Sequence, residues 1–594
     1  MKLVLPSLLL LVLAGSLFFA GLGSLPLLEP DEGRNAEVGR EMLSSGDWVT
    51  PHYDGLPYLD KPPIFFFLVA ASLKLGGPNE WSARAPSAVT GLCLLLLSWL
   101  LARRMFGEST ALRATAVIAS APLVVVFSRS VIFDMTLAVL LTLAMVCYWL
   151  AQAADFRRPG LDILLFLAMG LATITKGPIG FLLPLLSIAV YQALRGKLRE
   201  LKRLRWGLGC VVFLSVAMPW FILVSLRHPD FPRYALLEES LARFAGGLVH
   251  RKGGLLYYFP VYLAGFFPWS IFLLWAGWKR HKRWREFRDS SFSSNLYLLT
   301  WSGVIFVFFS LSRSQLPGYF LPALVPLGVL MAKAWDEVGS PGAARPPDWL
   351  TAGFASLLGL GLLIAASSQL GFFASPRSHW ARQLDPDVFA LLKPSLLYTG
   401  LILAALAVVG RNVAARARGA SLSVATLALL AFTAPALLGR WIAPLRAYAE
   451  SHSSRRLANT ILLSPERDLP LYGYYYFRTS LPFYLRRSVG LVSTNGNELT
   501  SNYLAWRVGQ RRHQPSARPG GEAAPTFKDL DPFPLDQRRL LNVLEFIGLT
   551  RSSPQPRMVL VRNTHVSLLY NDLDRIEPLW PGWEYSVWNI PGGQ

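Results

Sequence analysis

Charged residues are scarce in this chain: Asp, Glu, Lys and Arg make up 16% of its 594 residues, whereas hydrophobic residues make up 53%. A soluble globular chain carries about 25% charged residues. The shortage excludes a soluble cytosolic enzyme and an intrinsically disordered protein. Cysteine is scarcer still, and Cys93, Cys147 and Cys210 all lie in apolar runs. We therefore expect no disulfide framework and no CxxC metal site.

Acidic residues are the rarer of the two charge types, with 37 Asp and Glu against 58 Lys and Arg, a formal net charge of +21. In a nucleic-acid-binding protein this excess would form basic patches on a soluble surface. Here the basic residues lie between long apolar runs, which is typical of a polytopic membrane protein. We expect membrane lipids as partners and no nucleic acid.

Long apolar runs predict the membrane-spanning helices. A span needs about 20 predominantly apolar residues, and the sequence predicts about 13 transmembrane helices. They are expected near residues 4–23, 84–102, 112–128, 135–153, 161–174, 178–194, 207–225, 257–277, 294–311, 317–334, 350–372, 393–410 and 420–440.

Basic clusters orient these spans, because Lys and Arg are enriched in cytoplasmic loops. Each cluster follows an even-numbered span, as in Arg103–Arg104 after the second and Lys279–Arg288 after the eighth. The N-terminus is therefore predicted to be cytoplasmic, in a multi-pass membrane protein. The loop 24–83 and the chain after residue 440 are predicted to lie outside.

Two segments leave alternatives within this plan. The apolar segment 62–74 is too short to cross, so we expect a re-entrant or interfacial helix on the outer face. The first 24 residues have a cleaved signal peptide as their alternative, which would remove one span and leave the remaining topology unchanged.

Composition changes after residue 440, so we predict a transmembrane domain over 1–440 and a periplasmic α/β domain over 441–594. Strands are expected at Leu471–Arg478 and Met558–Val561, with helices near 446–462 and 536–547. The segment 509–534 is rich in Pro, Gly and polar residues, which favours a loop.

Four basic residues contradict the orientation rule, because they fall on the outer side at membrane depth: Lys61, Lys176, Arg243 and Arg313. Lys61 precedes Pro62, Lys176-Gly177 precedes Pro178, and Arg313 lies before Leu316-Pro317. Proline is a common residue at a helix start. Helix N-termini and cations together attract anions, so we expect a cationic basin that binds a lipid-linked phosphate. The alternative is that each cation pairs separately with a phospholipid headgroup.

Two carboxylates are predicted on the same side. Asp31 begins a short helix that ends near Gly46, and Asp134 begins the fourth span. Both carboxylates would converge on one cavity, with Asp31 acting as a general base or orienting an acceptor. The alternatives are a helix cap for either residue and a solvated acidic face for the Asp31 helix.

Tyr319 belongs to the same outer rim, where its hydroxyl can donate to a phosphate oxygen. An interfacial aromatic belt is the alternative. No paired histidine spacing points to a metal, and no cofactor is expected to be required. His228 and His250 share an outer loop with acidic residues, which leaves a divalent metal as an open alternative.

An ordered set of short motifs runs along nearly the whole chain. It comprises EPDEGRNAEVGREMLSSGDWVTPHYDGLPYLDKPP in the first outer loop, then FDM, TKG, MPWF, RFA, YYFPV, SRSQLPGYFLP and, in the tail, SLPFYLRR. In order and spacing the set resembles the ArnT-like branch of the GT-C glycosyltransferases, relatives of the protein O-mannosyltransferases. Each motif alone is weak, whereas the ordered set is specific.

The resemblance implies a GT-C fold and an enzyme that takes a sugar from a polyprenyl-phosphate carrier to an acceptor at the periplasmic face. In ArnT the sugar is 4-amino-4-deoxy-L-arabinose and the acceptor is a lipid A phosphate. Asp31 matches the catalytic or acceptor-positioning carboxylate, and Asp134 matches a second acidic residue of the cavity. The groups around the carrier phosphate match Lys61, Arg243 and Tyr319, with Glu32, Arg34, Lys176 and Arg313 as supporting residues.

Alternatives remain within and beyond this family. Gln315 stands where ArnT often has Lys, and Asp60 where Glu is common, which is the form of the broader family with its diverse sugars. Another sugar or a protein acceptor is therefore an open alternative. A lipid-linked-sugar flippase would also use a cationic basin, although the chain shows no inverted repeats.

Overall fold

The computed structural model describes residues 4–242, 254–280, 292–338, 345–369, 386–417, 419–512, 531, 537–573, 576–582 and 584–592. The chain divides into two compact units. Unit 1 comprises Met1–Leu22, Arg84–Ile222 and Ser240–Ser451, and unit 2 comprises Gly23–Ala83, Leu223–Glu239 and His452–Gln594. Unit 2 thus combines an early loop, which ends at Ala83, with the C-terminal segment, which begins at His452.

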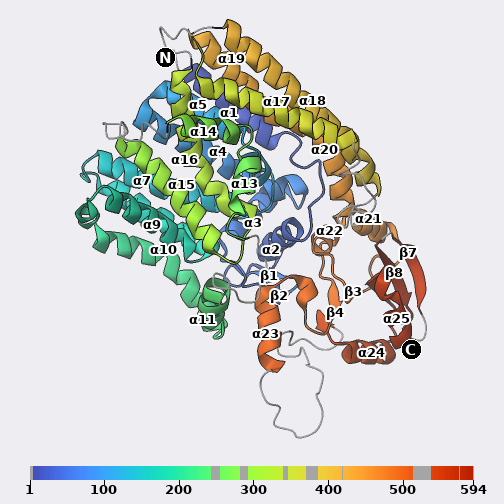
Figure 1. The fold of residues 1–594 in the computed structure, drawn as a ribbon. Coiled ribbons are helices and arrows are strands. Elements are labelled where there is room, and N and C mark those ends of the chain that lie inside the picture. Colours follow the sequence, from blue (N-terminus) through green and yellow to red (C-terminus); the bar gives the residue numbers. More distant parts are fainter. Residues whose placement is uncertain are drawn as a thin grey trace. The chain divides into compact units, whose positions relative to one another are not determined.

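Unit 1 consists mainly of apolar helices (Figure 1). They are α1 (Val4–Phe19), α4 (Glu80–Phe106), α5 (Glu108–Ala119), α6 (Pro122–Ser128), α7 (Asp134–Ala153), α8 (Pro159–Lys176), α9 (Ile179–Leu194), α10 (Trp206–Arg227), α13 (Tyr258–Gly265), α14 (Trp269–Arg280), α15 (Phe292–Leu311), α16 (Leu324–Ala334), α17 (Asp348–Gln369), α18 (Pro386–Arg416), α19 (Gly419–Ala431) and α20 (Thr433–Ser451). A 3-10 helix, η4 (Pro317–Ala323), precedes α16.

Each predicted span coincides with one of these helices or with a pair of them. Among the described residues, nine helices are long and apolar enough to cross a membrane, and counting two bent pairs as single spans gives up to 11. The bent pairs are α5–α6, at 67°, and α13–α14, at 111°. The chain is therefore a multi-pass helical membrane protein, while the count of 13 stays a prediction.

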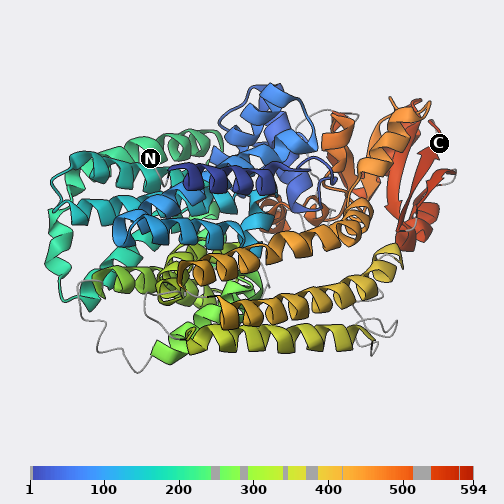
Figure 2. The ribbon, with the colours of Figure 1, turned by 90° about the horizontal axis from the view of Figure 1, so that it is seen from above.

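Close backbone contact holds some of these helices together. In both views α17 and α18 run side by side (Figure 2). A Cβ atom added to Gly361 would lie 2.7 Å from the backbone nitrogen of Ala404, and one added to Gly400 would lie 2.5 Å from that of Ala365. Small residues at such positions let helices in a membrane pack through their backbones.

The early part of unit 2 contains α2 (Asp31–Ser45), the two-residue strands β1 (His52–Tyr53) and β2 (Leu56–Pro57), and α3 (Ile64–Gly76). The predicted helix start at Asp31 is confirmed, and α2 ends at Gly46, whose φ of 70° suits glycine. Most of the segment 62–74 lies in α3 (Ile64–Gly76), a helix of 13 residues that is too short to span a bilayer. α2 and α3 pack closely at Gly39, where an added Cβ atom would lie only 2.5 Å from the Val69 side chain.

The C-terminal part of unit 2 forms a six-stranded sheet in the order β5-β4-β3-β6-β8-β7. Its strands are β3 (Leu471–Tyr474), β4 (Gly490–Val492), β5 (Leu540–Leu541), β6 (Arg557–Arg562), β7 (Glu577–Pro581) and β8 (Tyr585–Ile590). The first four pair in parallel, and β8 joins β6 and β7 antiparallel.

Helices connect these strands, as parallel pairing requires. They are α22 (Leu481–Leu485), α23 (Asn502–Arg512), α24 (Val543–Ser552) and α25 (Val566–Asp572), whereas α21 (Arg455–Leu463) precedes β3. β3 is shorter than predicted, because Tyr475 adopts a positive φ of 50° that turns the chain. The predicted loop 509–534 begins inside α23, and most of it lies outside the described residues.

Candidate active site

The residues predicted from the sequence divide between the two units. Unit 2 contains Asp31, Glu32, Arg34 and Lys61, unit 1 contains Asp134, Lys176, Arg313 and Tyr319, and Arg243 lies outside the described residues. The convergence of Asp31 and Asp134 on one cavity therefore stays a prediction. Within each unit the contacts of these residues are defined.

Asp31 is the first residue of α2 and forms an ion pair with Arg34, one turn further along the helix. The preceding residue, Pro30, occupies the N-cap position without a side-chain capping bond. The side chain of Asp31 is 46% exposed, whereas that of Arg34 is 11% exposed. A carboxylate that is oriented by a buried cation and still accessible is suited to contact a substrate.

The rest of α2 is not the solvated acidic face that was the alternative prediction. Glu32, Glu37 and Glu41 are all buried. Glu32 accepts a hydrogen bond from the backbone N–H of Leu28 at 3.0 Å, so this predicted supporting residue fixes the chain just before the helix. Because these acids are buried and internally bonded, α2 is a rigid support for Asp31.

Arg34 is fixed by a distant part of the chain. Its Nη1 atom donates to the Thr500 hydroxyl at 2.7 Å and to the Thr500 carbonyl at 3.1 Å. Its guanidinium also lies 5.5 Å from the ring centroid of Tyr58, within cation–π range. The group that orients Asp31 is thus itself held from two sides.

Lys61 forms an ion pair with Glu239, a residue of the π-helix Tyr234–Ala242. Its Nζ atom also donates to the backbone carbonyl of Asp60 at 2.9 Å. The side chains of Lys61 and Glu239 are 12% and 17% exposed. Lys61 was predicted to belong to a cationic basin, and its acidic partner was not predicted.

Asp60 was not among the predicted site residues, although it is buried and directly precedes Lys61. Its carboxylate accepts backbone N–H groups of Asn502 and Tyr503, both at 2.7 Å, and hydroxyls of Tyr234 at 3.1 Å and Ser501 at 3.3 Å. Burial and the nearby Glu239 carboxylate raise the pKa of Asp60. Its place in the DKPP motif was the signal that could have identified it.

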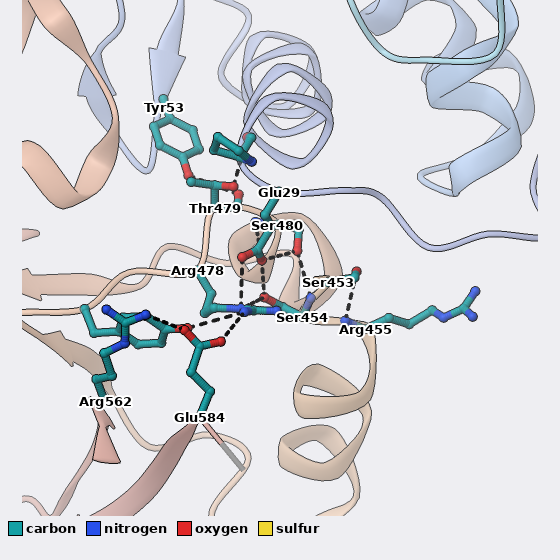
Figure 3. Close-up of polar contacts among 12 residues, drawn as sticks. Glu29, Tyr53, Ser453, Ser454, Arg455, Arg478, Thr479, Ser480, Arg562 and Glu584 are labelled. Carbon is teal, nitrogen blue, oxygen red and sulfur yellow. Dashed lines mark hydrogen bonds and ion pairs between the residues drawn. The ribbon is translucent and has the colours of Figure 1, made fainter. Parts of the chain in front are cut away.

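A second acid, Glu29, was also missed, and its side chain is 13% exposed (Figure 3). It forms an ion pair with Arg478 at 2.9 Å and accepts hydrogen bonds from the hydroxyls of Ser454 and Ser480, both at 2.6 Å. Glu29 lies two residues before Asp31, so these contacts fix the entry of the chain into α2. The motif match SLPFYLRR lies beside Arg478 but does not indicate its partner.

In unit 1, Asp134 and Lys176 form a buried ion pair. Asp134 is the first residue of α7, Phe133 occupies its N-cap position without a side-chain capping bond, and the Asp134 carboxylate instead binds Lys176. The two side chains are 7% and 6% exposed. Lys176 is the last residue of α8 and lies two residues before Pro178, the N-cap residue of α9, so its place beside a helix N-terminus agrees with the prediction. The prediction of a cationic basin did not include the acid from α7 that balances the charge of Lys176.

Tyr319 completes this cluster. Its ring lies 4.0 Å from the Lys176 ammonium, which is cation–π geometry. Its neighbour Gly318 permits the approach, because a Cβ atom there would lie 2.9 Å from the carboxyl carbon of Asp134. Arg313 is exposed between α15 and η4, outside this cluster. The structure therefore brings together Asp134, Lys176 and Tyr319.

Among the described residues, no group of three or more His, Cys, Asp or Glu side chains could hold a metal ion. His228 Nε2 lies 3.1 Å from the Thr50 hydroxyl, and burial lowers the pKa of the His228 imidazole. His250 lies outside the described residues. Metal dependence stays an untested question.

Comparison with known sequences identifies related enzymes. Residues 60–223 match the family model of dolichyl-phosphate-mannose-protein mannosyltransferases. The undecaprenyl phosphate-alpha-4-amino-4-deoxy-L-arabinose arabinosyl transferase of Aeromonas salmonicida is 33% identical over 372 residues, covering 61% of this chain and 67% of the relative. The enzyme of the same name from Pseudomonas aeruginosa is 34% identical over 356 residues, covering 59% of this chain and 63% of that relative.

Comparison with solved structures covers the chain more completely. The crystal structure of ArnT from Cupriavidus metallidurans bound to undecaprenyl phosphate aligns with a TM-score of 0.80 and 27% identity, over 99% of both chains. The apo form of that protein gives a TM-score of 0.78 over the same share of each chain. The similarity therefore extends through both units, beyond the segments matched by sequence.

Proposed function

Because the chain belongs to the ArnT-like family of GT-C glycosyltransferases, we propose that it transfers 4-amino-4-deoxy-L-arabinose from undecaprenyl phosphate to a phosphate of lipid A. As a member of this family it is a glycosyltransferase that uses a lipid-linked sugar. The names of its relatives support this sugar and this carrier. We place the reaction at the periplasmic face of a bacterial inner membrane, because the basic clusters predict the loop 24–83 on the outer side.

The observation that carries the proposal is the accessible carboxylate of Asp31 on a buried helix. Arg34 orients it, while the acids that follow it along α2 are buried and bonded. In an inverting transfer the acceptor approaches the anomeric carbon from the side opposite the leaving phosphate. Asp31 would align the acceptor there, or remove its proton when the acceptor is not already ionised.

Cations would stabilise the leaving undecaprenyl phosphate as its negative charge develops. We assign this role to Lys61 and Arg243, with Tyr319 as a hydrogen-bond donor. Glu239 is the carboxylate that binds the Lys61 ammonium, and it presents the same kind of charge as a phosphate oxygen. Donor binding would therefore exchange one oxyanion for another, so Lys61 keeps a partner throughout.

The protein in lipid nanodiscs, incubated with undecaprenyl-phosphate-linked sugars and lipid A, tests the proposal, with mass spectrometry of both lipids. We expect lipid A to gain one aminoarabinose unit. Asp31→Asn should lower the rate at least about 100-fold, the scale of general-base catalysis. Asp468→Asn is the matched control, because the Asp468 side chain is 90% exposed and should leave the rate unchanged.

Each other outcome identifies an alternative. Donor consumption without modified lipid A would reject this acceptor and favour another one, including a polypeptide, as the mannosyltransferase family match suggests. Turnover with a different sugar alone would reject aminoarabinose. Near-normal turnover by Asp31→Asn would remove Asp31 from the reaction.

A further inference from the structure

Four consecutive residues of the C-terminal segment contact the partners of both proposed active-site groups in unit 2. Thr500 binds Arg34, which holds the Asp31 carboxylate. Ser501, Asn502 and Tyr503 bind Asp60, which directly precedes Lys61. One short turn therefore contacts both Arg34, which holds the Asp31 carboxylate, and Asp60, which precedes Lys61.

The conformation of Thr500 is unusual. Its φ of 56° places it in the left-handed region, which a β-branched residue rarely adopts. Its backbone N–H donates to the carbonyl of Asn497 at 2.9 Å, while its carbonyl and hydroxyl both accept from the Arg34 guanidinium. Outliers of this kind persist where surrounding contacts hold them, and they concentrate at functional sites.

The Asp60 side of the turn is fixed by the start of a helix. The 11-residue helix α23 begins at Asn502, and Asp60 accepts N–H groups from its first two residues. An acid at this place satisfies orphan donors and is favoured by the helix dipole. Because Lys61 follows Asp60 and its ammonium donates to the Asp60 carbonyl at 2.9 Å, the position of Lys61 follows that of α23.

We propose that the turn Thr500–Tyr503 is a positioning element that holds the Asp31 carboxylate and the Lys61 ammonium at a fixed separation during sugar transfer. The inference rests on the function proposed for these two groups. The turn itself does not touch the substrate; it acts through Arg34 and Asp60. Displacing a reacting group by about 1 Å can lower a rate about 100-fold, so such a support affects turnover directly.

Thr500→Val tests how the turn supports Asp31 through Arg34. Valine keeps the branched shape and has a methyl group in place of the hydroxyl that binds Arg34. A hydrogen bond to a charged group is lost, so kcat should fall about 10- to 100-fold, while KM for the lipid-linked donor stays within about twofold of wild type. Thr500→Ser keeps the hydroxyl and should restore kcat to within about threefold of wild type. The matched control is Thr460→Val, on the exposed face of α21, where the hydroxyl bonds only its own helix.

A double-mutant cycle separates positioning from general stability. In the Asp31→Asn background, Thr500→Val should lower kcat by less than about twofold, because the group that it positions is already absent. An equal further loss in that background, or an unchanged kcat for Thr500→Val alone, would overturn the proposal. Should Thr500→Val fail to fold, Thr500→Gly takes its place, because glycine suits the positive φ of this position and also lacks the hydroxyl. Its loss of kcat must likewise vanish in the Asp31→Asn background.

The same measurements separate this inference from the proposed function. A normal rate for Asp31→Asn would overturn the role of Asp31 and the positioning proposal with it. A low rate for Asp31→Asn together with a normal rate for Thr500→Val would overturn the positioning proposal alone.

Discussion

The buried ion pair of unit 1 gives a stability prediction that separates structure from catalysis. Lys176→Met leaves the Asp134 carboxylate without its cation, at a site where both side chains are less than a tenth exposed. Removing one partner of a buried ion pair costs about 3–5 kcal/mol, because an uncompensated charge stays buried. Replacing both partners by apolar residues of similar volume is often neutral. Lys176→Met with Asp134→Leu should therefore recover the stability that Lys176→Met loses.

Thermal unfolding of the detergent-solubilised protein, followed by fluorescence of its 19 tryptophans, measures this effect. We expect the apparent Tm of Lys176→Met to fall by about 2–4 °C, and that of the double variant to lie within about 1 °C of wild type. Lys333→Met is the control. Its ion pair with Asp336 is 37% and 32% exposed, and such pairs contribute about 0–1 kcal/mol.

Activity of the same variants tests the role of Asp134. If Asp134 lines the reaction cavity, the double variant should be stable and inactive. A double variant that is both stable and fully active would show that the pair is only structural. A wild-type Tm for Lys176→Met would refute the reasoning from burial itself.

Two further changes probe single sites. Burial, together with the nearby Glu41 carboxylate, raises the pKa of Asp54 well above its ordinary value, so its contribution to stability is complete below about pH 4 and declines as the pH rises. Asp54→Asn should flatten the dependence of Tm on pH between 4 and 8, and parallel curves for the two proteins would contradict this. Gly318→Ala would bring a Cβ atom to 2.6 Å from Phe127 and 2.9 Å from Asp134, so it should cost about 1–3 kcal/mol through overpacking. Tm and turnover should both fall, and unchanged values would show that neighbouring side chains can move aside.

Local features of the fold were predictable because they depend on residues close in the sequence. Hydrophobic run length located the helices, and a proline followed by an acid located the start of α2, whose end Gly46 also marks. The bends within α5–α6 and α13–α14 were not predicted, because an apolar run does not show where a helix breaks. Pro122, which begins α6, lies inside the apolar run that was predicted as one span. A proline at this place favours a break in the helix.

Ion-pair partners were much harder to predict, because they lie far apart in the sequence. Asp134 and Lys176 were both identified as site residues, yet nothing in the sequence pairs them across 42 positions. Arg34 and Thr500 are 466 positions apart. The charge of a cluster depends on such pairs, and this is why a cationic basin was expected where Lys61 and Lys176 each have an acidic partner.

The composition change at residue 440 suggested that the C-terminal segment is a separate domain, but the contacts of unit 2 give it a more direct role. Buried charges need partners, since an unpaired buried charge is strongly destabilising. In the early loop Arg34 and Asp60 are buried and Glu29 is 13% exposed, and each of the three is bound by residues after position 452. The early loop therefore cannot bury α2 and hold Asp31 in place by itself. The C-terminal segment supplies the missing partners, so it forms part of the structure that positions the proposed active-site carboxylate.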